Sequence, residues 1–512
     1  MVTRRILIKI HLHNEYKLNT NPHIINESAK FTRDMIWVAL SQIITAALGI
    51  LLLPILTKSY STEAYGIWTQ VNVTNALIVP VLMLALDTAV ITFLAGEEDH
   101  IKRRRSLGGM FSAILIFAVI MFVIVNIFAH QLSNLIFNNP SYTHFVLLTF
   151  LWTFVDCVFA FFISYMRARR QIIKLSFIQV GLYVGHVIVI VCLVPLGIGL
   201  EWVIAWIILA DTLFAIGTMF LIARQDGFPT LNFTGIMKFL SFALPQVPAV
   251  LLMWIIASSD RFFITHFLGL SKTGIYSSSD LIGAMETLVY TPIAYVLFPV
   301  ISKAWEQHKK DNVQNYIEYS TKLFLTLAIP AAVGLSMLSQ PLLRIITTSE
   351  YLVGWQLVLL VSVGTIFQGL FQINIYLIYL IKQTKWIPLI ATVCAVISAS
   401  LNYVLVPRIG IIGGAVSTCV SYFMLASIYF LWARKIIAYK IDLLFLGKVI
   451  VASFLIVLFL HYFKATNILD IIFDAIAGIV IFVLAIFLLR AFSEQDKKLI
   501  KESLSGFIPR RH

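Results

Sequence analysis

Long apolar runs separated by short polar segments make up most of the chain. Each run is about 20 residues long, the length that an α-helix needs to cross the hydrocarbon core of a bilayer. None alternates strictly between apolar and polar positions, as a membrane β-strand does. The runs predict an all-α polytopic membrane protein with about fourteen transmembrane helices. The predicted spans lie near residues 34–57, 71–94, 109–130, 145–166, 175–195, 201–223, 241–267, 280–301, 321–341, 354–380, 386–406, 411–433, 445–463 and 471–490.

Composition supports the same class of protein. Hydrophobic residues make up 60% of the 512 residues and charged residues 12%, whereas a soluble domain usually has about 25% charged residues. A globular core cannot hide so much apolar surface, so the bilayer must be the solvent for most of the chain. The sequence contains no G-x-x-x-x-G-K-S/T phosphate loop and no H-E-x-x-H metal motif, and its loops are too short for a catalytic domain. We therefore expect a transporter rather than an enzyme.

The lysines and arginines orient the predicted spans. If the two tails and the even-to-odd loops lie on one side, that side carries 32 of the 38 basic residues. The opposite loops carry 5, and Arg261 lies inside a predicted span. Because cytoplasmic loops are enriched in lysine and arginine, we expect both termini in the cytoplasm and the chain in the cell (inner or plasma) membrane. The net charge of +13 follows from this topology and does not indicate nucleic-acid binding.

The two blocks of six spans are faintly similar. Gly-Ile-aromatic triplets begin at Gly66, after span one, and at Gly274, after span seven, an offset of 208 residues. A similar offset of 212 relates Pro195 to Pro407, near the ends of spans five and eleven. Because six is an even number, both repeats enter the membrane from the same side, which makes them parallel copies. We expect two six-helix lobes around a central cavity, followed by two extra helices.

The same patterns divide the chain into six parts. The expected parts are a cytoplasmic tail at 1–32, a first lobe at 33–223, a cytoplasmic linker at 224–240, a second lobe at 241–434, spans thirteen and fourteen at 435–491, and a basic cytoplasmic tail at 492–512. The sequence of the last tail is typical of an amphipathic helix at a membrane surface.

Three segments resemble a known family of transporters. SSDRFFITHFLGLSKTGIYSSSDLI resembles the seventh-span region of polysaccharide exporters and lipid-linked oligosaccharide flippases. LNYVLVPRIGIIGGAVSTCVSYF resembles the hairpin of spans eleven and twelve in that family, and TKSYSTEAYGIW resembles its loop after span one. The resemblance covers roughly residues 33–440 and implies a member of the multidrug/oligosaccharidyl-lipid/polysaccharide (MOP, MATE-like) superfamily.

The resemblance also implies a function. It implies a flippase or exporter that moves a polyprenyl-pyrophosphate-linked oligosaccharide or polysaccharide repeat unit from the cytoplasmic to the outer leaflet by alternating access. The implied partners are this lipid-linked substrate, membrane lipids, a polysaccharide polymerase and glycosyltransferases. A cation-coupled multidrug extruder of the same superfamily is the alternative. A membrane sugar polymerase or ligase would act on the same substrates, but the short outer loops argue against it.

Ionisable groups inside hydrocarbon are costly, so each is a candidate for function. The guanidinium of Arg261 suits a pyrophosphate oxygen, and the alternative is an ion pair with an acid of a neighbouring helix, such as Glu286 or Asp211. Asp260, Glu286 and Tyr276 are the other substrate-binding candidates. Asp260 points about 100° away from Arg261 around the helix, so these two need not pair.

Three acids of the first lobe are candidates for coupling to an ion gradient. Asp87, Asp156 and Asp211 fall in predicted spans two, four and six. They could bind a proton or sodium ion, or form hydrogen bonds between helices. We interpret His186, in span five, as a core histidine. We expect no cofactor and no metal site.

Overall fold

The computed structural model describes residues 22–491 apart from residues 229, 231, 232, 234, 441 and 464. Every element in this part of the chain is a helix. The predicted tail at 492–512 and most of the tail at 1–32 lie outside the described residues. The domain boundaries given above stay predictions.

The helices follow one another with short connections. The first half contains α2 (Pro22–Ser59), α3 (Thr62–Leu82), α4 (Leu86–Leu94), α5 (His100–Ile127), α6 (Ala129–Phe137), η1 (Pro140–Tyr142), α7 (Thr143–Ala168), α8 (Ile172–Leu193), η2 (Val194–Leu196) and α9 (Leu200–Asp226). The second half contains α10 (Ile236–Ala243), η3 (Leu244–Gln246), α11 (Val247–Leu268), α12 (Leu270–Ala284), α13 (Thr287–Glu306), α14 (Lys310–Ile346), η4 (Ser349–Tyr351), α15 (Trp355–Leu380), η5 (Thr384–Trp386), α16 (Ile387–Ile409), α17 (Ile411–Ile436), α18 (Leu443–Tyr462) and α19 (Ile468–Leu488).

The number of membrane spans agrees with the hydropathy pattern. Within the described residues, 13 helices are long and apolar enough to cross a membrane. Helices α3 and α4 meet the same criteria together, as one span that is bent by 50°. The structure therefore confirms an all-helical, multi-pass membrane protein with 13 to 14 candidate spans.

A break inside the second span separates α3 from α4. Leu84 and Ala85 both have left-handed backbone angles, with φ of 55° and 52°, which non-glycine residues seldom adopt. The amide of Ala85 donates to the carbonyl of Pro80 at 3.2 Å, one residue further back than the α-helical pattern requires. The helix axis can therefore turn inside the membrane without leaving this amide unpaired.

The predicted eighth span, 280–301, runs across a break between two helices. The structure has α12, which begins at Leu270, and then α13, with Met285 and Glu286 between them. Lys272 and the serines at 277–279 make α12 too polar to be recognised as a membrane span from hydropathy. These serines are buried, and small residues let neighbouring helices approach closely inside a membrane.

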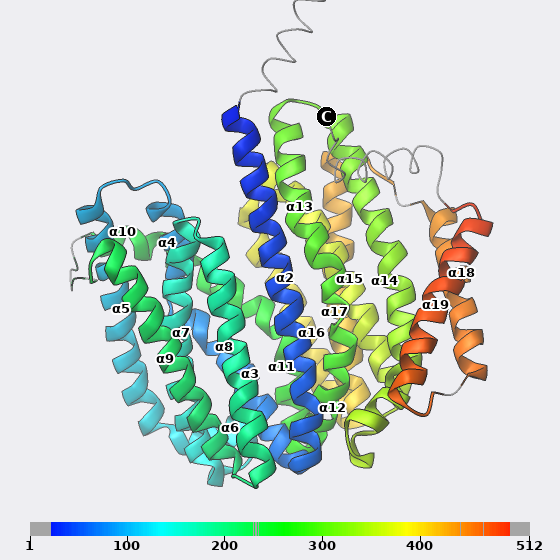
Figure 1. Cartoon of the computed structure of the whole chain (residues 1–512), viewed down its shortest axis with the longest axis horizontal. Coiled ribbons are helices and arrows are strands. Elements are labelled where there is room, and N and C mark those ends of the chain that lie inside the picture. Colours follow the sequence, from blue (N-terminus) through cyan, green and yellow to red (C-terminus); the bar gives the residue numbers. More distant parts are fainter. Residues whose placement is uncertain are drawn as a thin grey trace, which may run out of the picture.

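Two groups of helices lie side by side (Figure 1). Helices α3 to α9 share one hydrophobic core, which includes Val71 and Phe161. Helices α13 to α15 and α17 share another, which includes Phe324 and Ile373. The last pair, α18 and α19, packs on α14 at the edge of the second group through a smaller core around Val449. The structure therefore has two packed groups of helices, and the α18–α19 pair is added to the second group.

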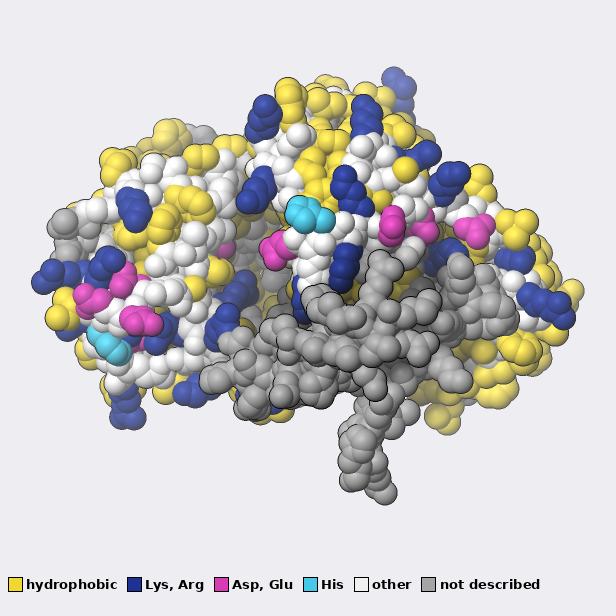
Figure 2. Space-filling model, turned by 90° about the horizontal axis from the view of Figure 1, so that it is seen from above, with side chains coloured by type: hydrophobic (Ala, Val, Ile, Leu, Met, Phe, Trp, Pro, Cys, Tyr) yellow, Lys and Arg dark blue, Asp and Glu magenta, His cyan; other side chains and the backbone are white. Residues whose placement is uncertain are grey.

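One face of the molecule is rich in basic side chains. Figure 2 shows many lysine and arginine side chains on the upper face, and the N-terminal end of α2 lies at this face in Figure 1. Cytoplasmic loops carry an excess of these residues. The upper face is therefore the cytoplasmic face in the predicted orientation.

Candidate functional site

Arg261 lies in an ion-pair network inside the second lobe. Its guanidinium, on α11, pairs with the carboxylate of Asp260 and with that of Asp280 on α12. The distance from Arg261 Nη1 to Asp260 Oδ1 is 2.9 Å. One positive charge faces two carboxylates, so the network carries an excess negative charge when all three groups are ionised.

Asp260 links three helices through this network. Its Oδ2 accepts hydrogen bonds from the hydroxyl of Tyr276 on α12, at 2.5 Å, and from that of Thr418 on α17, at 3.2 Å. The backbone amide of Arg261 donates to its Oδ1 at 2.8 Å. A buried carboxylate is tolerated where it is paired and hydrogen-bonded. Asp260 therefore meets that condition while fixing α11, α12 and α17 to one another.

A cavity of about 190 Å³ adjoins the network. Arg261, Tyr276 and Asp280 line it together with residues of α15 and α17, among them Gln368 and Thr418. The side chain of Asp280 is 21% exposed and that of Arg261 11%, whereas that of Asp260 is 1% exposed. The Arg261–Asp280 pair is therefore the part of the network that a ligand in the cavity can reach.

Arg261 does pair with an acid of a neighbouring helix, the alternative that the sequence offered, but this acid is Asp280 and not Glu286 or Asp211. Asp260, which need not pair with Arg261 on helix geometry alone, pairs with it as well. The guanidinium folds back along its own helix, where Nη1 also approaches the carbonyl of Ala257 at 3.4 Å, and this brings it to the neighbouring carboxylate. The substrate-binding roles of Arg261, Asp260 and Tyr276 stay predictions.

Glu286 lies in the break between α12 and α13, apart from the Arg261 network. It is 1% exposed, and neither carboxyl oxygen has a hydrogen-bond partner. The next residue, Thr287, lines the Arg261 cavity, but Glu286 is not among the lining residues. The structure therefore does not bring Glu286 together with the other substrate-binding candidates.

A second polar cluster lies in the first lobe. Asp211 on α9 bonds the Nε2 atom of His186 at 2.5 Å and accepts a hydrogen bond from the indole of Trp152 at 2.8 Å. Asp156 on α7 accepts from the side-chain amide of Asn75 at 2.6 Å. Asp156 and Asp211 are close enough for their charges to interact. Helices α7, α8 and α9 therefore bring two carboxyl groups and an imidazole together.

This cluster can hold a proton, because carboxyl and imidazole groups in contact exchange protons readily. Asp87 stands apart from it, in the first turn of α4, and forms no hydrogen bond or ion pair with Asp156 or Asp211. No group of three or more His, Cys, Asp or Glu side chains that could hold a metal ion occurs among the residues that the structure describes.

Sequence reasoning missed several members of both clusters. Asp280 carries a weak signal, since it follows Tyr276 by one helical turn and so shares its face. Thr418 and Asn75 carry none, because uncharged polar residues are common in membrane helices. His186, which we interpret as a core histidine, has its hydrogen-bond partner in Asp211, one of the candidate coupling acids.

Polar contacts join the two lobes at the ends of their helices. The ammonium group of Lys58, at the end of α2, donates to the carbonyl of Ile345 at 2.7 Å. The amide of Asn138, after α6, donates to the carbonyl of His266 on α11 at 3.3 Å. A further bond lies deeper, from the indole of Trp254 to the carbonyl of Val73 at 3.2 Å. In the predicted orientation the first two contacts close the outer side.

A curated relative with similar sequence is a transport protein. The chain is 23% identical over 329 residues to the succinoglycan biosynthesis transport protein ExoT of Rhizobium meliloti (strain 1021). The match covers 63% of this chain and 64% of the relative, so it spans less than two thirds of the relative's own length.

Solved structures of two transporters share the fold. The lipid II flippase MurJ, in an inward closed conformation, aligns with a TM-score of 0.74 at 15% identity, over 89% of this chain and 99% of that one. An inward-facing multidrug resistance MATE family transporter of the MOP superfamily aligns with a TM-score of 0.58 at 14% identity, over 77% of this chain and 95% of that one. The fold is therefore MATE-like, as the resemblance implied.

The sequence itself defines the family. The family described as "Polysaccharide biosynthesis protein" matches residues 55–355, from the end of α2 to the start of α15. The match covers more than half of the chain and includes every helix of the Asp211 cluster and, from the Arg261 network, α11 and α12. The chain belongs to the polysaccharide biosynthesis protein family.

Proposed function

We propose that the chain is a flippase that moves a polyprenyl-pyrophosphate-linked oligosaccharide from the cytoplasmic to the outer leaflet. The family match at residues 55–355 is the observation that carries this proposal. The names of a similar transport protein for succinoglycan biosynthesis and of a lipid II flippase with the same fold support it. A polysaccharide polymerase and glycosyltransferases would supply or consume this cargo.

In alternating access, the contact between the two lobes would break and form again in each transport cycle. Lys58 and Asn138 of the first lobe bond backbone carbonyls of the second at the end that is outer in the predicted orientation. Breaking a few such bonds opens that side, and the cargo leaves when the lobes separate there. The conformation with these bonds formed would receive the cargo from the cytoplasmic leaflet.

Arg261 is our candidate for the pyrophosphate contact. A pyrophosphate oxygen in the cavity would replace the carboxylate of Asp280 on the guanidinium, while Asp260 keeps its bond to Nη1. The guanidinium stays paired throughout, and the displaced carboxylate of Asp280, whose side chain is 21% exposed, would take up a proton, so that no unpaired charge stays buried. It also makes binding compete with an internal ion pair, so that the cargo can be released again.

The decisive experiment is lipid analysis of cells that lack the protein. Polyprenyl-pyrophosphate sugars on the two leaflets are separated and identified. The proposal expects one defined oligosaccharide-lipid to accumulate on the cytoplasmic side, and restoration of the full-length chain to remove it. An unchanged lipid profile contradicts the proposal.

A cation-coupled multidrug extruder is the second candidate function. The acids and imidazole around Asp211 favour it, because such a cluster suits the exchange of a proton or cation for a substrate. A MATE family drug transporter also shares the fold. Cells that lack the protein would then accumulate no oligosaccharide-lipid and become sensitive to cationic compounds.

A further inference from the structure

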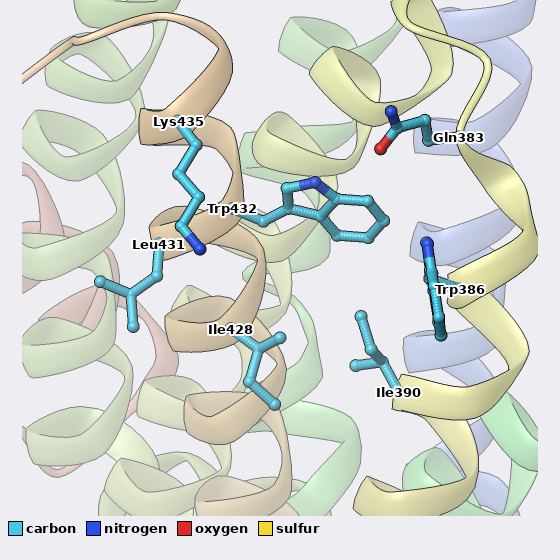
Figure 3. A pocket seen from close by; sticks show the side chains of 7 residues that line it. All are labelled: Gln383, Trp386, Ile390, Ile428, Leu431, Trp432 and Lys435. Carbon is cyan, nitrogen blue, oxygen red and sulfur yellow. The ribbon is translucent and has the colours of Figure 1, made fainter.

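A second cavity lies at the ends of α16 and α17, away from both polar clusters. Its volume is about 430 Å³, and it is lined by Gln383, Trp386, Ile390, Ile428, Trp432 and Lys435, with Leu431 beside them. Figure 3 shows Trp432 projecting from one helix across the cavity towards Trp386 on the other side. Gln383 lies at one end of the cavity, and Ile390 and Ile428 lie at the other.

The lining changes from polar to apolar along the helices. Lys435 lies in the last turn of α17, and Ile428 precedes it by about 10 Å along the axis at 1.5 Å per residue. Figure 3 shows the Lys435 side chain running along α17, so that its ammonium group lies at the level of the two indole rings, with Ile390 and Ile428 beyond them. Tryptophan favours the boundary between headgroups and hydrocarbon. The cation and the indoles therefore form the headgroup end of the cavity and the isoleucines its acyl-chain end, which matches the two parts of a phospholipid.

The electrostatics at the cavity mouth favour an anion. Residues 351–440 contain no aspartate or glutamate. Lys385 lies over the ring of Trp386, at 5.3 Å from the ring centre, which adds a second cation to Lys435. Exposed lysines near a membrane surface attract anionic headgroups, each with an energy of about 1 kcal/mol.

The cavity faces the bilayer rather than the interior of the protein. Trp386 is 46% exposed and Leu431 59% exposed, and Leu389 and Val393 continue the same exposed apolar surface along α16. A ligand that enters from this side arrives through lipid. A sugar would also need several hydrogen-bonding groups, and Gln383 is the one uncharged polar side chain in the lining.

We propose that this cavity binds one anionic glycerophospholipid, with its phosphate at Lys385 and Lys435 and its chains against Ile390 and Ile428. The lipid would lie in the leaflet that faces the cytoplasm in the predicted orientation. It would bridge η5 and the end of α17, and so hold the cytoplasmic ends of α16 and α17 together. This inference does not depend on which cargo the protein transports.

The test uses the purified full-length chain and native mass spectrometry with added dioleoylphosphatidylglycerol or dioleoylphosphatidylcholine. We expect one phosphatidylglycerol to be retained selectively. The Lys385→Glu/Lys435→Glu variant should weaken that binding at least about 25-fold, or about fivefold for each lysine. Lys310→Glu is the matched control, because Lys310 also lies over a tryptophan, at 5.9 Å, but this tryptophan, Trp305, does not line the cavity, whereas Trp386 under Lys385 does.

Three outcomes would overturn the proposal. One is equal retention of the two lipids by the parental chain, and another is unchanged retention of phosphatidylglycerol in the double-lysine variant. The third is full competition by glycerol phosphate, which lacks acyl chains, since the site would then bind a soluble phosphate. Trp386→Ala/Trp432→Ala provides a separate check, because it should weaken phosphatidylglycerol binding without any change in charge.

Discussion

Gly66 on α3 and Gly274 on α12 occupy reciprocal positions in one close contact between the lobes. A Cβ atom on Gly66 would lie 2.0 Å from the carbonyl oxygen of Leu270, and one on Gly274 would lie 2.4 Å from that of Thr62. Leu270 and Gly274 follow Thr62 and Gly66 by the same 208 residues. The two helices that carry the faint sequence repeat therefore pack on each other in a pseudo-twofold arrangement.

Substituting either glycine should weaken the closure of the lobes. Gly66→Ala and Gly274→Ala place a methyl group against backbone atoms that cannot yield, and we expect a cost of about 1–3 kcal/mol to this contact. Spin labels at the exposed positions 196 and 344, one in each lobe, should then show a longer or broader distance distribution. Gly217→Ala is the control, because its Cβ would meet no atom within 4 Å. An unchanged distribution in both glycine variants would show that this contact does not control closure.

The Arg261–Asp280 pair allows a substrate contact to be separated from a structural ion pair. Arg261→Ala should reduce export about 10- to 100-fold, the usual effect of losing a hydrogen bond to a charged group. Asp280→Asn should bind the cargo more tightly and export it more slowly, because the carboxylate that competes for Arg261 is lost while Asp260 still holds the guanidinium.

The double variant Arg261→Ala/Asp280→Asn completes this cycle. It removes the unpaired carboxylate that Arg261→Ala leaves in the cavity, so it should be more thermally stable than Arg261→Ala and still fail to export. Recovery of export in the double variant would assign Arg261 a purely structural role. Surface expression and melting temperature serve as controls for folding.

The cluster around Asp211 should couple transport to an ion gradient. Asp156→Asn and Asp211→Asn keep the shape of the side chains but remove the groups that exchange a proton. We expect both variants to lose the dependence of transport on a proton or sodium gradient in proteoliposomes. Asp87→Asn is the comparison, because Asp87 has no bond to this cluster. Unchanged gradient dependence in all three variants would remove the coupling role from these acids.

Glu286 should tolerate a neutral isostere. Its carboxyl group is buried without a hydrogen-bond partner, and an ionised carboxylate in that position would be very costly. Glu286→Gln should therefore leave the melting temperature unchanged or raise it, whereas Glu286→Lys should prevent stable insertion. If Glu286→Gln keeps full stability but loses transport, the ability to bind and release a proton is the property that matters.

The predicted orientation can be tested with single cysteines and a membrane-impermeant thiol reagent. Lys102, before the apolar part of α5, and Lys272, in the first turn of α12, are both exposed and belong to opposite sides of the predicted topology. In intact cells Lys272→Cys should react and Lys102→Cys should react only after permeabilisation. The reverse pattern would invert the topology.

Hydropathy and charge were sufficient to predict the number of spans, because both are properties of whole segments. They could not predict the start of α12, since Lys272, which stays exposed, and three serines, which only a partner helix buries, make this segment polar. They also could not predict which acid pairs with Arg261, because the path of a long side chain depends on the space around it. The sequence therefore singles out Arg261 as a buried cation, whereas it indicates Asp280 only weakly and Thr418 not at all.

The attachment of α18 and α19 makes the two halves of this protein mechanically unequal. The pair rests on α14 and presents most of its other surface to lipid. If the second lobe rotates during transport, the pair must move with it and displace the surrounding acyl chains. The first lobe carries no such added pair of helices. The speed of the cycle should therefore depend on the viscosity and lateral pressure of the lipid on one flank of the molecule more than on the other.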